Sequence, residues 1–190
     1  MPNPFEQIRA NSNDQKKSFD WYMRQVREVS KSITSASSTL NSGIGELTQK
    51  LEMGSMYMFK YDAKHKDTLP YWDSFPLCLP IEPSPGGFYG MNLHYLPYGL
   101  RAQLLGKLLE TADSRTLSSD SQMGYNWDML KNASRFPEVK PCVKRYLTTQ
   151  MQSRFLKINP QDWKAAIFLP VEDFNKASRQ KVYRDSREMI

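Results

Sequence analysis

A dense run of aromatic residues and prolines between Met56 and Tyr98 constrains the fold of this chain more than any other feature. The run holds ten aromatic side chains and six of the twelve prolines. Each buried aromatic ring removes roughly 150–250 Å² from water, so a short run of this kind can supply much of a core. In Met56–Tyr61 the aromatics occupy every second position, which is the period of a β-strand. Because no enzymatic motif falls inside the run, we interpret it as a structural scaffold.

Prolines and glycines divide the rest of this run into further strands. The segment Phe75–Ile81 contains two prolines, which cannot donate to a strand ladder, and it is predicted to be an edge or bulged strand. Glu82–Gly87 (EPSPGG) is typical of a tight turn, since proline presets φ and glycine accepts positive φ. Phe88–Leu96 then predicts a third strand.

These strands, together with the helical spacing elsewhere, predict an α+β fold. Its centre is a small curved antiparallel β-sheet or barrel, built from about residues 56–96 plus a late strand near 154–158. Several helices pack around this sheet, and a helical arm precedes it. Apolar spacing predicts these helices over residues 46–52, 100–111, 125–134, 139–151 and 171–187, with a further helical turn after Asn159-Pro160.

The first fifty residues are predicted to form an N-terminal arm, and residues 51–190 a compact α+β domain. In the arm, a helix from about residue 14 to residue 31 is followed by a Ser/Gly-rich linker over residues 32–45. An isolated amphipathic helix is marginal in water, so its apolar stripe must cover something. It either docks on a neighbouring subunit or folds back onto its own domain. The stripe consists of Phe19, Tyr22, Met23, Val26 and Val29.

No set of residues in the sequence has the spacing of a catalytic or metal site. The chain has two histidines and two cysteines, all far apart in sequence, whereas a zinc site needs them clustered. We therefore predict no metal, no cofactor and no enzymatic activity, and we expect His94 to be a packed or hydrogen-bonded histidine. Cys78 lies in an apolar run, which favours a reduced, buried thiol and a reducing cytoplasm. The sequence contains no apolar run of about eighteen residues, so no membrane span is expected. The N-terminus is not expected to be a secretory signal.

The net charge of +6 is concentrated near the C-terminus. Residues 1–138 carry fifteen basic and fifteen acidic side chains, whereas residues 139–190 carry eleven basic and five acidic ones. An acidic partner, either nucleic acid or protein, would suit this excess. The last predicted helix presents a basic face that either neutralises phosphates or is simply solvated. This face consists of Lys176, Arg179, Lys181, Arg184 and Arg187.

Several short motifs resemble a small family of virion proteins from large contractile-tailed phages of the T-even type. The resemblance covers most of residues 54–190. The motifs that carry it are Met56–Tyr61, Leu69–Asp73 (LPYWD), Phe75–Leu77, Gly87–Gly90, Asn92–Pro97 (NLHYLP), Trp163, Phe168–Glu172 and Asp185–Arg187. It implies a component of the tail, baseplate or neck, or a protein bound to the ends of the packaged genome.

Two functional hypotheses follow from the sequence and the resemblance together. The first is a non-enzymatic virion structural protein, assembled in the host cytoplasm, whose partners are other virion proteins in a symmetric assembly. The alternative is a DNA-binding protein that protects the ends of the packaged genome with its basic C-terminal face. Nucleic acid is the less favoured partner of the two, and no membrane partner is expected.

Overall fold

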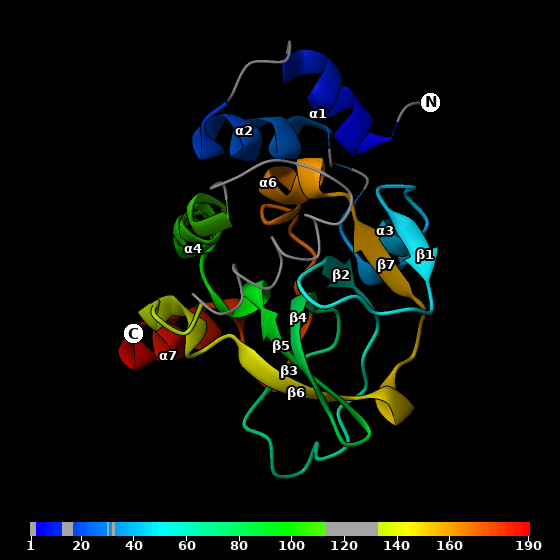
Figure 1. The fold of residues 1–190 in the computed structure, drawn as a ribbon, viewed down its shortest axis with the longest axis vertical. Coiled ribbons are helices and arrows are strands. Elements are labelled where there is room, and N and C mark those ends of the chain that lie inside the picture. Colours follow the sequence, from blue (N-terminus) through cyan, green and yellow to red (C-terminus); the bar gives the residue numbers. More distant parts are fainter. Residues whose placement is uncertain (1–2, 13–16, 30, 32, 113–132) are drawn as a thin grey trace.

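The computed structural model describes residues 3–12, 17–29, 31, 33–112 and 133–190 and shows an α+β fold (Figure 1). The described strands form a six-stranded antiparallel sheet and a separate two-stranded one. The larger sheet is open rather than a closed barrel, because β1 and β6 lie at its two edges. In spatial order its strands are β1 (Glu46–Thr48), β7 (Phe155–Ile158), β2 (Met56–Met58), β4 (Leu77–Ser84), β5 (Gly87–Asn92) and β6 (Val143–Leu147). The smaller sheet pairs β3 (Trp72–Asp73) with β8 (Phe174–Asn175).

Side chains that alternate along the central strands separate two buried clusters. Met56 and Met58 belong to a mainly aliphatic cluster, whereas Tyr57, Phe59 and Tyr61 belong to an aromatic one. Phe59 makes edge-on contacts in the aromatic cluster, with ring centroids 5.3 Å from Tyr146. The aromatic face is therefore confirmed, whereas the strand itself ends at Met58 rather than at the predicted Tyr61.

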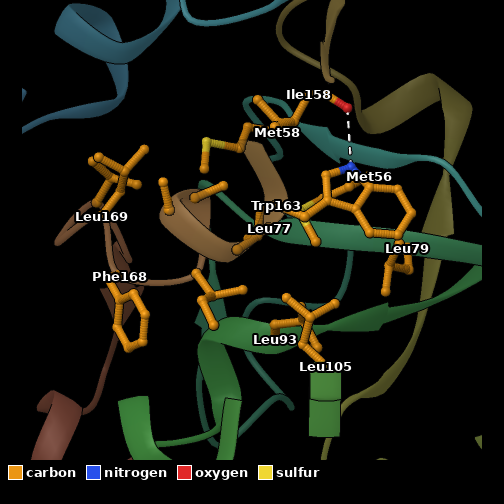
Figure 2. Packing of buried hydrophobic residues seen from close by; sticks show 14 of the residues in the cluster. Met56, Met58, Leu77, Leu79, Leu93, Leu105, Ile158, Trp163, Phe168 and Leu169 are labelled. Carbon is orange, nitrogen blue, oxygen red and sulfur yellow. Dashed lines mark hydrogen bonds between the residues drawn. The ribbon is translucent and has the colours of Figure 1, made fainter. Parts of the chain in front are cut away.

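Helices cover the aliphatic cluster. They are α1 (Pro4–Ser12), α2 (Phe19–Val29), α3 (Ala36–Leu40), α4 (Tyr98–Ala112) and α6 (Trp163–Ala166), and a last helix, α7 (Arg179–Met189), ends the chain. Figure 1 shows α1 and α2 lying across α6, with α4 beside it. Figure 2 shows Trp163 within this cluster, where its indole Nε1–H donates to the carbonyl of Ile158 at 3.1 Å. Within the described residues, no helix combines the length and apolarity needed to cross a membrane.

Of the two alternatives predicted for Phe75–Ile81, the bulged strand is confirmed and the edge strand is wrong. β4 lies between β2 and β5, and its pairing with β5 shifts between Pro80 and Glu82. The prolines are tolerated because β2 pairs with only the first two residues of β4. Beyond this pairing with β2, the carbonyl of Pro80 accepts a hydrogen bond from the Gly54 N–H at 2.9 Å. The predicted turn is confirmed, with Gly86 at φ +73°.

Two helix predictions are wrong because sheet pairing decided the conformation. Residues 46–52 contain β1, which pairs with β7, and residues 139–151 contain β6, which pairs with β5. The apolar spacing in 139–151 fits a helix, but β5 leaves an edge that these residues complete. The late strand near 154–158 is confirmed as β7.

The first fifty residues contain more structure than predicted. Phe5 and Ile8 of α1 are buried, although this segment was expected to be a polar arm. The predicted flexible linker contains α3, which a capping box at Ser35 begins. Ile33 and Ile44, on either side of α3, join the aliphatic cluster of the remaining chain. The division of the chain at about residue 50 stays a prediction.

Three further helix predictions concern residues after Tyr98. The predicted helix over 171–187 begins later, at α7, because Ser178 caps it and β8 precedes it. The predicted helix over 125–134 falls almost wholly outside the described residues. The helix over 100–111 is confirmed as α4.

Candidate nucleic-acid interface

A cavity of about 380 Å³ lies where the segment after β2 meets β6. Three separate segments supply its walls: residues 61–73, Tyr95 and residues 144–147. We call it the aromatic–basic pocket, because five aromatic rings and four basic side chains are among its lining residues. These lining residues are Tyr61, Ala63, Lys64, His65, Leu69, Pro70, Tyr71, Trp72, Asp73, Tyr95, Lys144, Arg145, Tyr146 and Leu147.

Buried tyrosines form the deep part of the pocket. Tyr95 is 5% exposed and lies 6.0 Å from the ring of Tyr71 and 5.3 Å from that of Phe174. The Lys144 ammonium sits over Tyr95, with Nζ 4.1 Å from the ring centroid. Burial lowers the pKa of Lys144, and the contact with the ring face offsets part of this desolvation. The pocket therefore places a cation directly on an aromatic surface.

The outer part of the pocket is more accessible. Tyr71 and Trp72 are half-buried, whereas Lys64, His65 and Arg145 are exposed. Arg145 donates through Nη2 to the carbonyl of Pro85 at 2.9 Å, which holds it near the β4–β5 hairpin. None of the ion pairs within the described ranges involves a lysine or arginine that lines the pocket. No carboxylate in the described part of the chain therefore neutralises these charges.

Asp73 also lines the pocket, but its carboxylate is already occupied. It accepts from the Phe75 N–H at 3.0 Å, from Asn92 Nδ2 at 3.0 Å and from the Asp173 N–H at 3.1 Å. Its Oδ2 also lies 2.9 Å from Nδ1 of His94, and both side chains are fully buried. Burial alone would raise the pKa of Asp73, but His94 and the hydrogen bonds lower it. His94 is therefore a packed, hydrogen-bonded histidine, as predicted.

Lys176 ties the wall of the pocket to the segment before α7. Its backbone φ is +65°, a conformation that is uncommon outside glycine. Its Nζ donates to the carbonyl of Lys66 and, at 3.3 Å, to that of Leu69, and it lies 5.7 Å from the Trp72 ring centroid. Lys176, one of the five predicted basic-face residues, thus supports the pocket wall.

The other predicted basic-face residues are partly paired with acids. Lys181 binds Asp185 at 2.8 Å, and Arg184 lies 3.8 Å from the same carboxylate. Arg179 pairs with Glu172 at 3.2 Å, and Arg187 is exposed. Lys181 also lies 5.9 Å from the Tyr71 ring centroid, which makes α7 continuous with the aromatic–basic pocket.

In contrast to the basic side chains described above, Arg101 of α4 is fully buried, next to α7. It donates to the carbonyls of Leu96 at 2.6 Å, Ile167 at 3.0 Å and His94 at 3.2 Å. It also donates to Glu172 Oε1 at 3.0 Å and to the Tyr183 hydroxyl oxygen at 2.6 Å. These bonds join four separate parts of the chain, so Arg101 is a structural centre.

The apolar stripe that was predicted to dock on a partner lies against this chain's own core. Val26 is buried, and Phe19, Tyr22, Met23 and Val29 are half-buried and pack on the aliphatic cluster. Phe19 contacts Phe168, with ring centroids 6.5 Å apart. Docking of this stripe on a neighbouring subunit stays a prediction.

Metal binding and thiol chemistry find no support among the described residues. Across these ranges, no three His, Cys, Asp or Glu side chains form a group that could hold a metal ion. Cys78 and Cys142 are free and buried, as predicted for Cys78. Burial raises the pKa of both thiols, which disfavours the reactive thiolate.

The sequence did not identify the pocket, although one signal pointed to it. Lys64, His65 and Lys66 come shortly before Tyr71 and Trp72, and basic residues interleaved with aromatics are typical of nucleic-acid binding. The contribution of β6 was hidden, because residues 139–151 were predicted to be a helix.

Comparison with known proteins identifies the family of this chain. Residues 7–188 match the model of a family described as phage T4 terminal DNA protecting protein. No curated protein matches, and no solved structure matches. Since the family match spans nearly the whole chain, the protein belongs to the phage T4 terminal DNA protecting protein family.

Proposed function

We propose that this protein binds the ends of linear DNA and shields them, within the virion after assembly in the host cytoplasm. The description of its family supports this alternative over the tail, baseplate or neck role. Contacts with other virion proteins are compatible with it.

The aromatic–basic pocket is the observation that carries this proposal. Proteins that hold nucleic acid without sequence preference combine a positive groove with aromatic rings on which bases stack. The pocket has both, and its lysines and arginine have no carboxylate partner among the described residues. Lys181 of α7 borders the pocket at the Tyr71 ring, but its charge is paired with Asp185.

In this proposal the protein protects a DNA end by staying bound to it and not by catalysing a reaction. The buried Asp73–His94 pair has no exposed side-chain surface, so it cannot reach a substrate as it stands. A bound protein excludes a nuclease from a DNA end for as long as it stays there. The protein is therefore proposed to be non-enzymatic.

An exonuclease protection assay tests this function. A linear duplex labelled at one end is mixed with the protein and then with an exonuclease. We expect the label to survive, and unlabelled linear duplex to abolish the protection by competing for the protein. Protection should also decrease steeply with salt, because counterions are released when phosphates are bound.

A covalently closed circle of the same sequence is the matched competitor. It offers the same phosphates and bases but no end, so it should compete much less well than the linear duplex at equal mass. Equal competition by the circle would show general DNA binding and would contradict the proposal.

A further inference from the structure

The size of the aromatic–basic pocket limits what part of a DNA end can enter it. Its volume of about 380 Å³ is near the lower end of pockets that hold small ligands. Residues of the segment 61–73 and of β6 line it, together with the buried rings of Tyr95 and Tyr146. A pocket of this size suits a ligand as large as one nucleotide.

Two of the rings that line the pocket, Tyr71 and Trp72, are half-buried rather than buried. Lys176 Nζ lies 5.7 Å from the Trp72 ring centroid and supports that ring. A base can stack on an aromatic face whatever its identity, because every base has a π-face. Terminal recognition by these rings would therefore be independent of sequence.

The cations are placed to bind the phosphate of such a nucleotide. Lys144 lies over the Tyr95 ring, and Arg145, the next residue of β6, also lines the pocket. Lys64, from the segment 61–73, also lines the pocket. A phosphate bound in the pocket would meet positive charge from both segments, with the carboxylate of Asp73 already occupied by four hydrogen-bond partners.

We propose that the aromatic–basic pocket holds one unpaired terminal nucleotide, with its base on Tyr71 or Trp72 and its phosphate on Lys144 and Arg145. This inference rests on the proposed function, and it specifies how an end is distinguished from internal DNA. Only an end can deliver a single nucleotide without opening the duplex on both sides. Unpairing costs least for a base that is already single-stranded, so ends that fray or carry an overhang bind best.

Binding to duplexes that differ only at their ends tests the inference in the wild-type protein. Four duplexes are compared. One has a blunt end, one has a short 5′ overhang, one has a short 3′ overhang, and one has its terminal base pair covalently cross-linked. We expect the overhang to bind more tightly than the blunt end and the cross-linked end to bind most weakly. The two overhangs show which strand enters the pocket.

Photocrosslinking locates the terminal base. With 5-iodo-2′-deoxyuridine at the terminal position, irradiation should link the DNA to the peptide that contains Tyr71 and Trp72, as identified by mass spectrometry. The same base placed several positions inward should not link to that peptide. Absence of this link for the terminal base, or equal binding of blunt and cross-linked ends, would overturn the inference.

Substitutions separate stacking from folding. Trp72→Leu should weaken binding to the overhang about 5- to 100-fold, whereas Trp72→Phe keeps a ring and should retain most of the affinity. Trp21→Leu on α2 is the matched control, since Trp21 does not line the pocket. If Trp72→Leu does not fold, the comparison of duplex ends and the crosslink decide the question in the wild-type protein.

The outcomes for the two proposals differ. If circular DNA competes as well as linear DNA, the proposed function fails. If linear DNA is preferred but cross-linked ends bind as well as frayed ones, the proposed function stands and the nucleotide pocket fails.

Discussion

Arg101 and Lys144 are both basic side chains set against tyrosine rings, yet their surroundings differ sharply. Arg101 lies 4.6 Å from the Tyr98 ring centroid, is fully buried and is bound to Glu172. Lys144 lies 4.1 Å from the Tyr95 ring centroid, at a cavity that opens to solvent, and no described carboxylate pairs with it. The charge of Arg101 is paired inside the protein, whereas the charge of Lys144 remains available to a ligand.

Charge alone therefore does not identify a binding residue. A buried cation requires a carboxylate and hydrogen-bond acceptors, because its desolvation is otherwise too costly. A cation over a ring at a pocket keeps part of its hydration and can exchange it for a phosphate. Substitutions at Arg101, at Lys144 and at their neighbours can test this difference.

The largest effect is expected from Arg101→Met. Removing one partner of a buried ion pair leaves an uncompensated charge and typically costs about 3–5 kcal/mol. Chemical denaturation should show a decrease of that order in the free energy of unfolding, while the folded fraction should still bind DNA ends. Lys144→Met is the matched control and should leave the free energy of unfolding nearly unchanged. A loss of stability as large as that of Arg101→Met would contradict the contrast.

Glu172→Gln tests the acidic partner of Arg101. Burial alone would raise the pKa of Glu172, but Arg101, together with His94 and the hydrogen bond from Tyr183, lowers the pKa to about 2. The unfolded chain therefore takes up this proton at higher pH than the folded protein. The stabilisation is fully present above about pH 4.5 and is lost as the pH falls towards about 2.

We expect Glu172→Gln to lower the free energy of unfolding at neutral pH by about 3 kcal/mol and to flatten its decrease in acid. Urea titrations at several pH values measure both effects. Glu188→Gln, at an exposed position on α7, is the control and should change neither. An unchanged acid dependence in Glu172→Gln would show that this carboxylate does not contribute.

The smallest effect on folding, but a clear one on binding, is expected from Lys144→Ala combined with Arg145→Ala. For each phosphate that the variant no longer neutralises, the slope of log affinity against log salt should decrease by about 0.7–0.9. The matched pair Lys181→Ala and Arg184→Ala should change this slope less, because Asp185 already interacts with both side chains. Salt titrations of end binding measure the slopes. Equal changes for the two pairs would remove the distinction between paired and unpaired cations.

Local patterns in the sequence were sufficient wherever one segment determined its own conformation. The alternation in Met56–Tyr61 predicted which residues face the aromatic cluster, and Pro85 with Gly86 predicted the hairpin turn. The leucines after Tyr98 predicted α4. In each case the period or the backbone restriction acts over a few neighbouring residues.

Local patterns failed where a distant segment decided the outcome. Residues 139–151 have apolar spacing that suits a helix, but pairing with β5 makes β6 a strand. Gly90 also has a role visible only in three dimensions, because a Cβ there would come within 2.3 Å of the Cys78 sulfur. Phe5 and Ile8 formed too short a pattern to predict a helix, yet the core buries both.

The sequence by itself therefore determined the α+β class, the aromatic strand, the hairpin, the late strand and the C-terminal excess of positive charge. Which basic residues have no acidic partner was decided only by the tertiary structure. Lys64, Tyr95 and Lys144 lie far apart in the chain and meet because β6 pairs with β5 and the segment after β2 folds beside it. A pocket depends on contacts between distant segments, and periodicity along one segment carries no information about them.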